Sequence, residues 1–179
     1  MYYSSTCPSP LGTLTLASDG THLVGLWIEG QKYFGASLPT SPKPRDDLPL
    51  FAAVRDWLAR YFAGKAPSPA ELPLRPAGSA FRQVVWRILC GIPYGRVMTY
   101  GEIAVEAAAQ LGRVRMSGQA VGGAVGHNPI SIIIPCHRVV GANGSLTGYA
   151  GGVDKKLRLL ELEGVDTSTL FIPRKGTAL

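Results

Sequence analysis

Two short apolar runs near the start of the chain flank a polar turn. Residues 11–17 and 23–28 are rich in leucine and β-formers, and the turn between them contains Asp19-Gly20. This arrangement predicts a β-hairpin. Farther along, apolar residues recur at helical spacing and stop at Gly64, which predicts an amphipathic helix over a small sheet. Its apolar positions are Leu50, Phe51, Val54, Trp57, Leu58, Tyr61 and Phe62.

The next part of the chain has a helical pattern. Residues 81–89 carry one apolar stripe, and the turn at 92–95 ends it. Thr99 and Glu102 have the spacing of a capping box, which predicts a helix running to about Gln110. A connection with two arginines then leads to a short helix of small residues. This order of elements predicts a helix-turn-helix.

Three further signals complete the predicted elements. Ser117 is expected to cap the helix of small residues at 118–126. The apolar residues 131–134 predict a buried strand. Asp154 is expected to cap a last helix over residues 155–163, which a glycine ends.

A proline-rich stretch divides the chain. Proline fixes φ and removes a backbone donor, so residues 65–79 predict a stiff, extended linker. We expect two domains, an N-terminal α/β lobe at 1–78 that includes this linker and a C-terminal lobe at 79–179. The first holds seven Lys/Arg against six Asp/Glu, and the second holds eleven against six. A polyanionic partner is therefore expected at the second lobe.

Composition narrows the class of protein. With 179 residues, 46% of them apolar, the chain can bury a real core and is not expected to be disordered. No apolar run approaches the roughly 18–20 residues that span a bilayer, so no membrane partner is expected. The first ten residues lack the layout of a secretory signal, which favours a cytoplasmic protein. The net charge of +6 is only a weak indication of a polyanion.

The cysteines do not form a disulfide pattern. There are three of them, Cys7, Cys90 and Cys136, and no CxxC pair. Cys7 and His22 are two candidate zinc ligands, but two ligands do not close a tetrahedral site. We therefore expect no metal and no cofactor.

Cys136 is followed directly by His137, and a thiolate beside an imidazole is a nucleophile with its base. Adjacent residues on an extended chain point to opposite sides, so the pair needs a turn, which Pro135 favours. The alternative is a buried cysteine beside an incidental histidine, and the dipeptide alone leaves both open.

The segment around this pair is long and specific. Residues 128–140 read NPISIIIPCHRVV, and this string resembles the active-site segment of the O6-alkylguanine-DNA alkyltransferases, the methylated-DNA–protein-cysteine methyltransferases. Other pieces match that family in order: FRQVVWRIL with IPYG at 81–95, TYGEIA at 99–104, AVGGA at 120–124, GYAGG at 148–152 and LLELEG at 159–164. The resemblance implies an α+β fold. A small N-terminal α/β lobe with an antiparallel, ribonuclease H-like sheet would precede a mainly helical, winged helix-turn-helix-like lobe.

The resemblance also implies a reaction. Cys136 would accept the alkyl group of an O6-alkylguanine in DNA irreversibly and once per molecule, with O4-alkylthymine as an open second substrate. His137 would act as general base through a water, oriented by Glu163. Asn128 would brace the active-site turn, and Tyr100 would donate to the base and help it leave.

The family resemblance further implies how substrate and DNA are held. The carbonyls of Cys136 and Val139 would accept the guanine amino group, and Tyr149 would pack on the flipped base. The base would rotate out of the duplex, because its reacting atom is otherwise inside the stack. It would do so from the minor-groove side. The helix of small residues would approach that groove closely, and arginines would contact phosphates. The DNA-binding candidates are Ser117, Gly118, Gln119, Ala120, Gly122, Arg82 and Arg115, with Arg113 beside them.

Two positions depart from the family pattern. Gln119 stands where the family usually has an arginine that fills the space of the flipped base, which predicts weaker DNA affinity or slower flipping. Arg115 is a candidate substitute, because the connection before the short helix is longer than usual. Ala150 stands where some relatives have a serine, so only its backbone N–H remains as a donor to the guanine oxygen.

We weigh three functions. The first is repair by alkyl transfer to Cys136 in double-stranded DNA, by a protein expected to be a monomer. The second is a DNA-damage-sensing helix-turn-helix protein without catalysis, and the third is a thiol hydrolase. The joint presence of Cys136, His137 and Glu163 favours the first.

Overall fold

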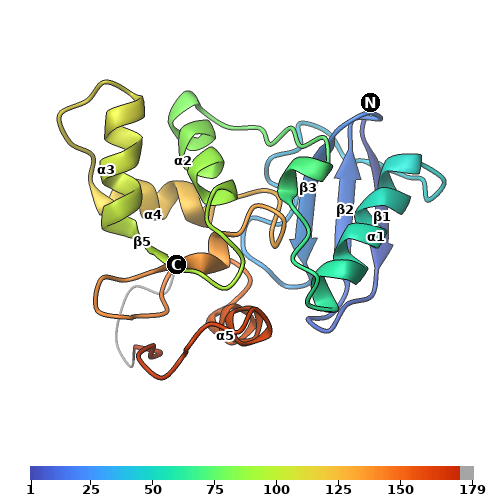
Figure 1. Ribbon diagram of the computed structural model, residues 1–179. Helices are drawn as coiled ribbons and strands as arrows, with labels where there is room; N and C mark the ends of the chain where they lie inside the picture. The colour runs from blue at the N-terminus through green and yellow to red at the C-terminus, as the bar shows by residue number, and fades with distance from the viewer. Residues whose placement is uncertain (174–179) are drawn as a thin grey trace. The chain divides into compact units, whose positions relative to one another are not determined.

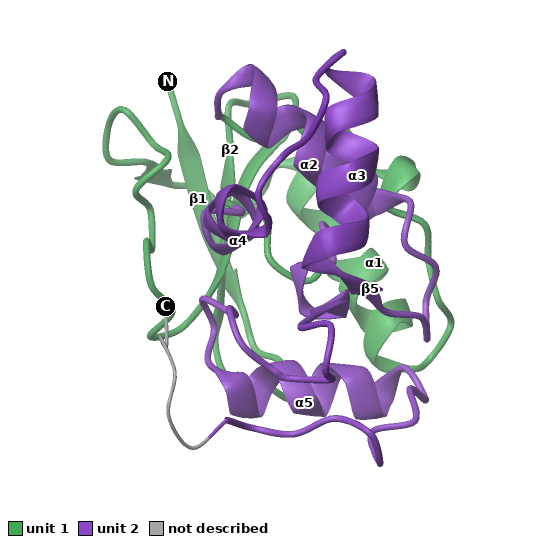
Figure 2. Ribbon diagram, turned by 90° about the vertical axis from the view of Figure 1, so that its left-hand side faces the viewer, with its two compact units in different colours: residues 1–77, 129–133 green, residues 78–128, 134–179 purple. Residues whose placement is uncertain are grey.

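The computed structural model describes residues 1–173 and divides the chain into two compact units. Unit 1 comprises Met1–Ala77 and Pro129–Ile133, and unit 2 comprises Gly78–Asn128 and the chain from Ile134 onward (Figure 2). The sequence placed one division after residue 78. In the structure the short segment Pro129–Ile133 belongs with unit 1 as well.

Unit 1 contains a four-stranded sheet of order β3-β2-β1-β4 (Figure 1). The strands are β1 (Tyr3–Cys7), β2 (Leu14–Ser18), β3 (Leu23–Ile28) and β4 (Lys43–Pro44). β1 and β3 are both antiparallel to β2, and β4 is parallel to β1. The predicted hairpin is therefore confirmed as β2 and β3. Every residue of β3 is buried, as in a strand that is covered on both faces.

β1 is not predicted from the sequence, because its central residues Ser4, Ser5 and Thr6 are polar. Ser5 is nevertheless buried, and its hydroxyl bonds to Asp46 and Arg55. Both partners lie more than forty residues away in the sequence, so no local pattern predicts the strand.

Helix α1 (Pro49–Phe62) confirms the predicted amphipathic helix. Its buried residues are Phe51, Val54, Trp57, Leu58 and Tyr61. The proline-rich stretch after it is not a free linker. A 3-10 helix at Pro69–Glu71 is capped by Ser68, whose carbonyl also accepts from Trp57 Nε1, and Leu74 bridges to Leu23 of β3. Most of that stretch is therefore part of unit 1.

Unit 2 is mainly helical. It contains α2 (Ala80–Cys90), α3 (Tyr100–Gln110), α4 (Gly118–Gly126) and α5 (Val153–Leu162). The predicted capping box closes the start of α3, with Thr99 accepting from the Glu102 N–H and Glu102 accepting from the Thr99 N–H. The indole of Trp86 in α2 donates to the carbonyl of Ala124 in α4 at 2.9 Å, which ties the first helix of the unit to the third.

Two short parallel strands join the start of α3 to the segment after Cys136. β5 (Met98–Thr99) pairs with β6 (Val139–Val140). The last helix starts differently from the prediction, because its N-cap is Gly152 at φ +97° and not Asp154. Asp154 lies in the first turn, where a carboxylate favours the positive end of the helix dipole.

The predicted strand at residues 131–134 is wrong. Ile130 makes one isolated bridge to Leu26, and the chain then turns. Ile132 has φ +71°, and the Ile133 N–H donates to the Ser131 carbonyl at 2.8 Å, which closes a three-residue turn. A positive φ is strained for a β-branched residue such as Ile132. A run of isoleucines therefore predicts an extended strand and not this turn.

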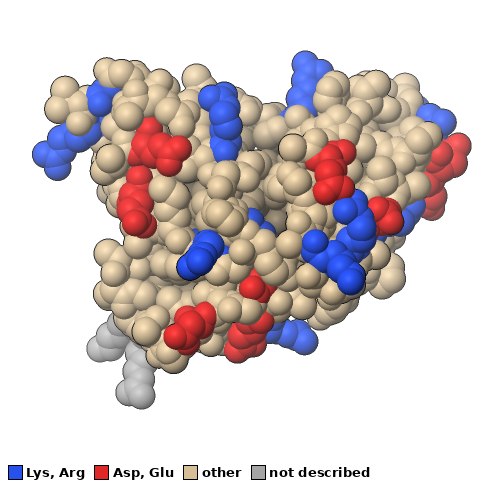
Figure 3. All heavy atoms as spheres, in the orientation of Figure 1, with Lys and Arg blue, Asp and Glu red and all other residues tan. Residues whose placement is uncertain are grey.

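No described helix is both long enough and apolar enough to cross a membrane. On the face drawn in Figure 3, lysines and arginines are scattered among acidic and neutral residues and do not gather in one patch. Charge on this face therefore does not locate a binding surface.

Candidate active site

Cys136 lies at a tight turn, as the sequence predicted. Pro135 has φ −81° and ψ 63°, and the Cys136 N–H donates back to the Ile134 carbonyl at 2.8 Å. A 3-10 turn over Cys136–Arg138 follows, so Cys136 and His137 are not on an extended strand. The cysteine is 3% exposed.

Asn128 braces this turn from the end of α4. Its Nδ2 donates to the Ile134 carbonyl at 2.8 Å and to Cys136 Sγ at 3.1 Å. Burial raises the pKa of the Cys136 thiol, and the Asn128 hydrogen bond and the Lys156 charge oppose that rise without cancelling it. At neutral pH the resting group is therefore a thiol, which needs a base before it can act as a nucleophile.

His137, Glu163 and Arg138 form a buried array beside Cys136. His137 Nε2 lies 2.6 Å from Glu163 Oε1, and Arg138 binds Glu163 through Nε at 2.8 Å and Nη2 at 3.0 Å. Burial alone would raise the pKa of Glu163, but His137 and Arg138 outweigh it and lower this pKa to about 2. Burial lowers the pKa of His137, against the raising effect of Glu163.

The directions of these pKa shifts show which atoms of Glu163 and His137 carry protons. Glu163 is ionised at neutral pH and can only accept, so His137 donates through Nε2. The imidazole is neutral, and its Nδ1 carries the lone pair. This is the arrangement of a base held by an orienting carboxylate.

Lys156 of α5 is fully buried and bridges two other segments. Its Nζ donates to the Val139 carbonyl at 2.5 Å and to the Thr147 carbonyl at 2.7 Å. Burial lowers its pKa to about 8, although Cys136 acts in the opposite direction. The Val139 carbonyl, a candidate acceptor for the substrate, is thus already bonded to Lys156.

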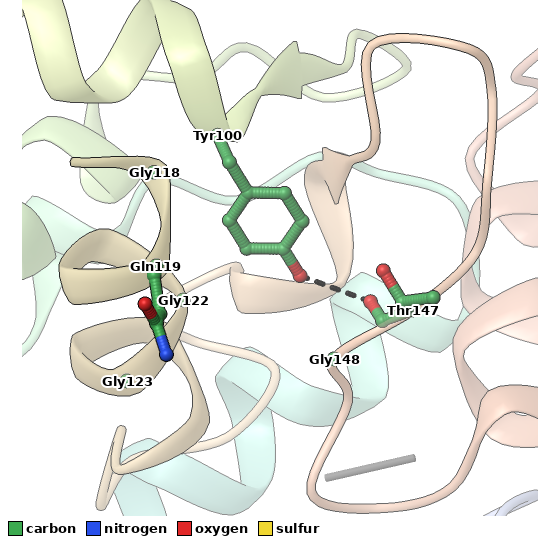
Figure 4. Close-up of a pocket in the computed structure, with 7 residues that line it drawn as sticks. All are labelled: Tyr100, Gly118, Gln119, Gly122, Gly123, Thr147 and Gly148. Carbon is green, nitrogen blue, oxygen red and sulfur yellow. Dashed lines mark hydrogen bonds between the residues drawn. The ribbon is translucent and has the colours of Figure 1, made fainter. Parts of the chain in front are cut away.

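A pocket of about 600 Å³ lies within unit 2, lined by Tyr100, Gly118, Gln119, Gly122, Gly123, Thr147 and Gly148. Figure 4 shows Tyr100 reaching from the start of α3 between α4 and the loop of Thr147. The Tyr100 hydroxyl donates to the Thr147 carbonyl at 2.9 Å, and burial raises its pKa to about 12. The hydroxyl therefore stays protonated across the neutral range and can donate a hydrogen bond.

Tyr149 follows the pocket loop and is 5% exposed. Its ring meets that of His137 edge-on at 6.5 Å between centroids. The hydroxyl is buried and has no hydrogen-bond partner in the part of the chain that the structure describes. Ala150 beside it is half-buried.

Three of the four glycines of α4, at 118, 122 and 123, have no packing reason among the described residues. A Cβ added at Gly118 or Gly122 would come no closer than 3.8 Å to Tyr100, and one at Gly123 would meet nothing within 4 Å. Glycine within a helix costs roughly 0.5–1 kcal/mol against alanine. Because these glycines lack side chains, another molecule can come close to the backbone of α4 on its accessible face.

The other DNA-binding candidates lie around α4. Ser117 caps the helix, accepting from the Ala120 N–H at 3.1 Å, so its side chain has a structural task. Gln119 is exposed at the pocket, and Arg115 is exposed in the connection before α4. Arg82 is half-buried in the first turn of α2.

Three residues around Cys136 were not predicted from the sequence: Lys156, Arg138 and Thr147. One signal was available for the lysine. Lys156, Leu159, Leu160 and Glu163 follow the i, i+3, i+4, i+7 spacing of a single helical face, so both charges extend an apolar stripe. Thr147 contributes its backbone carbonyl, which accepts from Tyr100 and Lys156, and a pattern of side chains cannot predict a contact of the backbone.

Comparison with known proteins assigns the family. Residues 80–165 match the family model described as "6-O-methylguanine DNA methyltransferase, DNA binding domain", and residues 1–76 match its ribonuclease-like domain. The two matches together span most of the chain. The chain therefore belongs to the 6-O-methylguanine DNA methyltransferase family, methyltransferases that act on DNA.

Relatives and solved structures agree with that family. The methylated-DNA–protein-cysteine methyltransferase of Mycobacterium tuberculosis is 46% identical over 164 residues, 91% of this chain and 93% of the relative. The Haemophilus influenzae protein of the same name is 41% identical over 167 residues, 91% of this chain and 87% of that protein. The crystal structure of the M. tuberculosis O6-methylguanine methyltransferase has a TM-score of 0.77 at 42% identity, covering 98% of this chain and 97% of that one. The M. tuberculosis OGT structure in complex with DNA has a TM-score of 0.76 at 42% identity, covering 95% and 98%.

Proposed function

We propose that the protein repairs DNA by moving the alkyl group of an O6-alkylguanine to Cys136, once per molecule. The observation that carries the proposal is the buried Cys136 thiol, bonded to Asn128 and adjacent in sequence to a neutral His137 that Glu163 orients. The name of the relatives, methylated-DNA–protein-cysteine methyltransferase, describes this reaction class.

The proposed chemistry balances without a cofactor. The Cys136 thiol gives its proton, through a water, to Nδ1 of His137. The sulfur then forms a bond to the alkyl carbon as the carbon–O6 bond breaks, and the electron pair goes to the guanine. Tyr100 donates a hydrogen bond and then its proton to the departing base, which leaves as neutral guanine. The proton held by the His137 imidazolium is released to solvent water and Tyr100 takes one up, so that both side chains end neutral. The thioether product has no leaving group at neutral pH, so Cys136 is not regenerated.

The DNA side of the proposal rests on the pocket of unit 2. A guanine that has rotated out of the duplex needs an enclosed space beside the thiol. The pocket of about 600 Å³ is a candidate entrance for such a base, because Tyr100 lines it, although Cys136 is not one of its lining residues. The glycines at 118, 122 and 123 would let the backbone of α4 approach a widened minor groove. When the base enters, the Tyr100 hydroxyl would turn from the Thr147 carbonyl to the base.

Gln119 and Arg115 make this version of the site unusual. We propose that Gln119, exposed at the pocket, occupies the space of the flipped base and bonds to the orphaned partner base through its amide. Arg115 is exposed in the connection of residues 111–117 and would add a phosphate contact. The sequence-based predictions of a monomer and of a cytoplasmic location stay predictions.

The test is the mass of the intact protein after incubation with a duplex holding one O6-methylguanine, followed by peptide mapping. We expect a gain of one methylene on the peptide that contains Cys136, and none in Cys136→Ser. No gain, together with retained binding to the modified duplex, would instead identify a damage-sensing protein. An equimolar limit to the reaction would establish that each molecule acts once.

A further inference from the structure

The segment Pro129–Ile133, which precedes the active-site turn, is bonded to β3 of unit 1. Leu26 of β3 donates its N–H to the Pro129 carbonyl at 2.9 Å and accepts from the Ser131 N–H at 2.9 Å. Leu26 and Ile130 thus form a parallel bridge. The segment Pro129–Ile133, which leads into the active-site turn, therefore pairs with the edge of β3 that does not face β2, the edge that Leu74 also joins at Leu23.

The side chain of Gln31 fastens this segment. Gln31 is 6% exposed, and its Oε1 accepts from the Ile28 N–H at 2.8 Å and from the Ser131 hydroxyl at 3.0 Å. Because a backbone N–H only donates, the amide atom that faces Ile28 is the oxygen. Ser131 is 2% exposed, so no water replaces this bond if it is lost.

The residue after Ser131 is the strained one. Ile132 is β-branched, buried and at φ +71°, and the Ile133 N–H bonds back to the Ser131 carbonyl across it. Such a conformation persists only where the surroundings fix it, and strain of this kind collects at functional sites. The contacts of Leu26 and Gln31 hold Ser131, where the turn begins. Cys136 follows Ile133 by only three residues, so the chain has little slack between the strained turn and the sulfur.

We propose that Gln31 and Ser131 are positioning residues for Cys136. Their contact holds the strained turn at Ile132 and thereby sets where the sulfur lies relative to Asn128 and His137. Unit 1 then has a defined task in the reaction, which is to hold the segment that precedes the acceptor cysteine. The inference deepens the proposed alkyl transfer and rests on it.

The first variant is Ser131→Ala, and the chain offers a matched control in Ser18→Ala. Ser18 is also a buried serine of unit 1, and its hydroxyl likewise has one bond, from the Gly20 N–H at 2.9 Å, within β2 and the turn that follows. Two rates are measured in the full chain. One is transfer from free O6-benzylguanine, which needs no DNA. The other is carbamidomethylation of Cys136 by iodoacetamide, read by peptide mapping.

We expect Ser131→Ala to slow transfer about tenfold, because displacements of about 1 Å cost large factors in rate. The same variant should speed the reaction of Cys136 with iodoacetamide, since a loosened segment exposes the sulfur. Ser18→Ala also removes one buried hydrogen bond, as Ser131→Ala does, but it should change neither rate by more than about twofold. Equal effects of the two variants, or unchanged rates in Ser131→Ala, would overturn the proposal.

A second variant, Gln31→Met, removes the acceptor and leaves the hydroxyl of Ser131. Residues that act through one contact are not additive. We therefore expect the double variant Gln31→Met/Ser131→Ala to transfer no more slowly than Gln31→Met alone, and multiplied effects would overturn the proposal. If the parent protein transfers no alkyl group while the iodoacetamide contrast persists, the proposed function fails and the positioning role stands.

Discussion

His137 and Glu163 meet through one short contact, with Nε2 2.6 Å from Oε1 and both side chains fully buried. Arg138 binds the same carboxylate and neutralises its charge, so the imidazole can stay neutral beside it. Glu163 therefore orients the ring and leaves Nδ1 as the basic atom. Four consequences of this array and its surroundings can be measured, and a fifth concerns the connection before α4.

Glu163→Gln should slow alkyl transfer about 100-fold, the lower range for loss of general base catalysis. Glutamine can present its amide N–H to His137 and favour the wrong tautomer, and the pKa of His137 should fall further without the carboxylate. Single-turnover kinetics with a modified duplex measure the rate. Glu161→Gln, an exposed position on the same helix, is the matched control and should leave the rate unchanged.

The same array makes the folded state sensitive to acid. The folded-state pKa of Glu163 lies at about 2, below its ordinary value of 4.5, so its stabilisation is present above pH 4.5 and lost as the pH falls towards 2. The lost stability is on the order of 3 kcal/mol. His137 acts in the same direction, because its lowered pKa lets the unfolded chain take up a proton first below about pH 6.5.

Urea unfolding at a series of pH values tests this dependence. The free energy of unfolding should fall from pH 6.5 downward and steepen below pH 4.5. In Glu163→Gln the steep part below pH 4.5 should flatten. An equally steep fall in that variant would show that other carboxylates govern acid unfolding.

Lys156→Met should lower activity much more than stability. Burial of the ammonium group is unfavourable at neutral pH, as its pKa of about 8 indicates, and methionine keeps the apolar stem. The variant removes the donor to the carbonyls of Val139 and Thr147 and a charge that favours the thiolate of Cys136. We expect at least a tenfold slower transfer and an alkaline shift of Cys136 alkylation by iodoacetamide, with a melting temperature within a few degrees. Arg158→Met, which removes an exposed charge from the same helix, should change neither.

Local signals in the sequence were sufficient for most helices of the fold. Thr99 with Glu102, and Ser117, cap their helices within three residues, so the chain itself carries the information. The turn at Cys136 was also predictable from Pro135. Contacts between distant residues could not be predicted from the sequence. The hydroxyl of Ser131 donates to Gln31, 100 positions away, next to a turn at Ile132 that a run of apolar residues does not predict. The resemblance named Cys136, His137 and Glu163, but Lys156 and Arg138 emerged only from the structure.

Gln119→Arg should speed transfer on duplex DNA without changing the reaction with free O6-benzylguanine. Gln119 is exposed at the pocket, and an arginine there is longer, charged and able to fill the space of a flipped base. We expect a rate on duplex at least about threefold higher and a salt dependence of binding steeper by about one unit in slope. A parallel gain on the free base would mean that the change acts on the chemistry and not on flipping.

Arg115→Ala should weaken binding to duplex DNA whatever its sequence. Arg115 is exposed in the seven-residue connection between α3 and α4, next to a fully exposed Val114. Its side chain forms no ion pair within residues 1–173. An arginine that contacts phosphate contributes about one unit to the slope of log K against log salt, so the variant should lose about that much. Fluorescence anisotropy with unmodified duplexes of two sequences measures both effects. The control is Arg60→Ala, since Arg60 in unit 1 is already paired with Asp56 and Glu71 and should leave DNA binding unchanged. If Arg115→Ala binds and repairs the duplex as the parent does, the connection has no part in DNA recognition, and Gln119 must act without it.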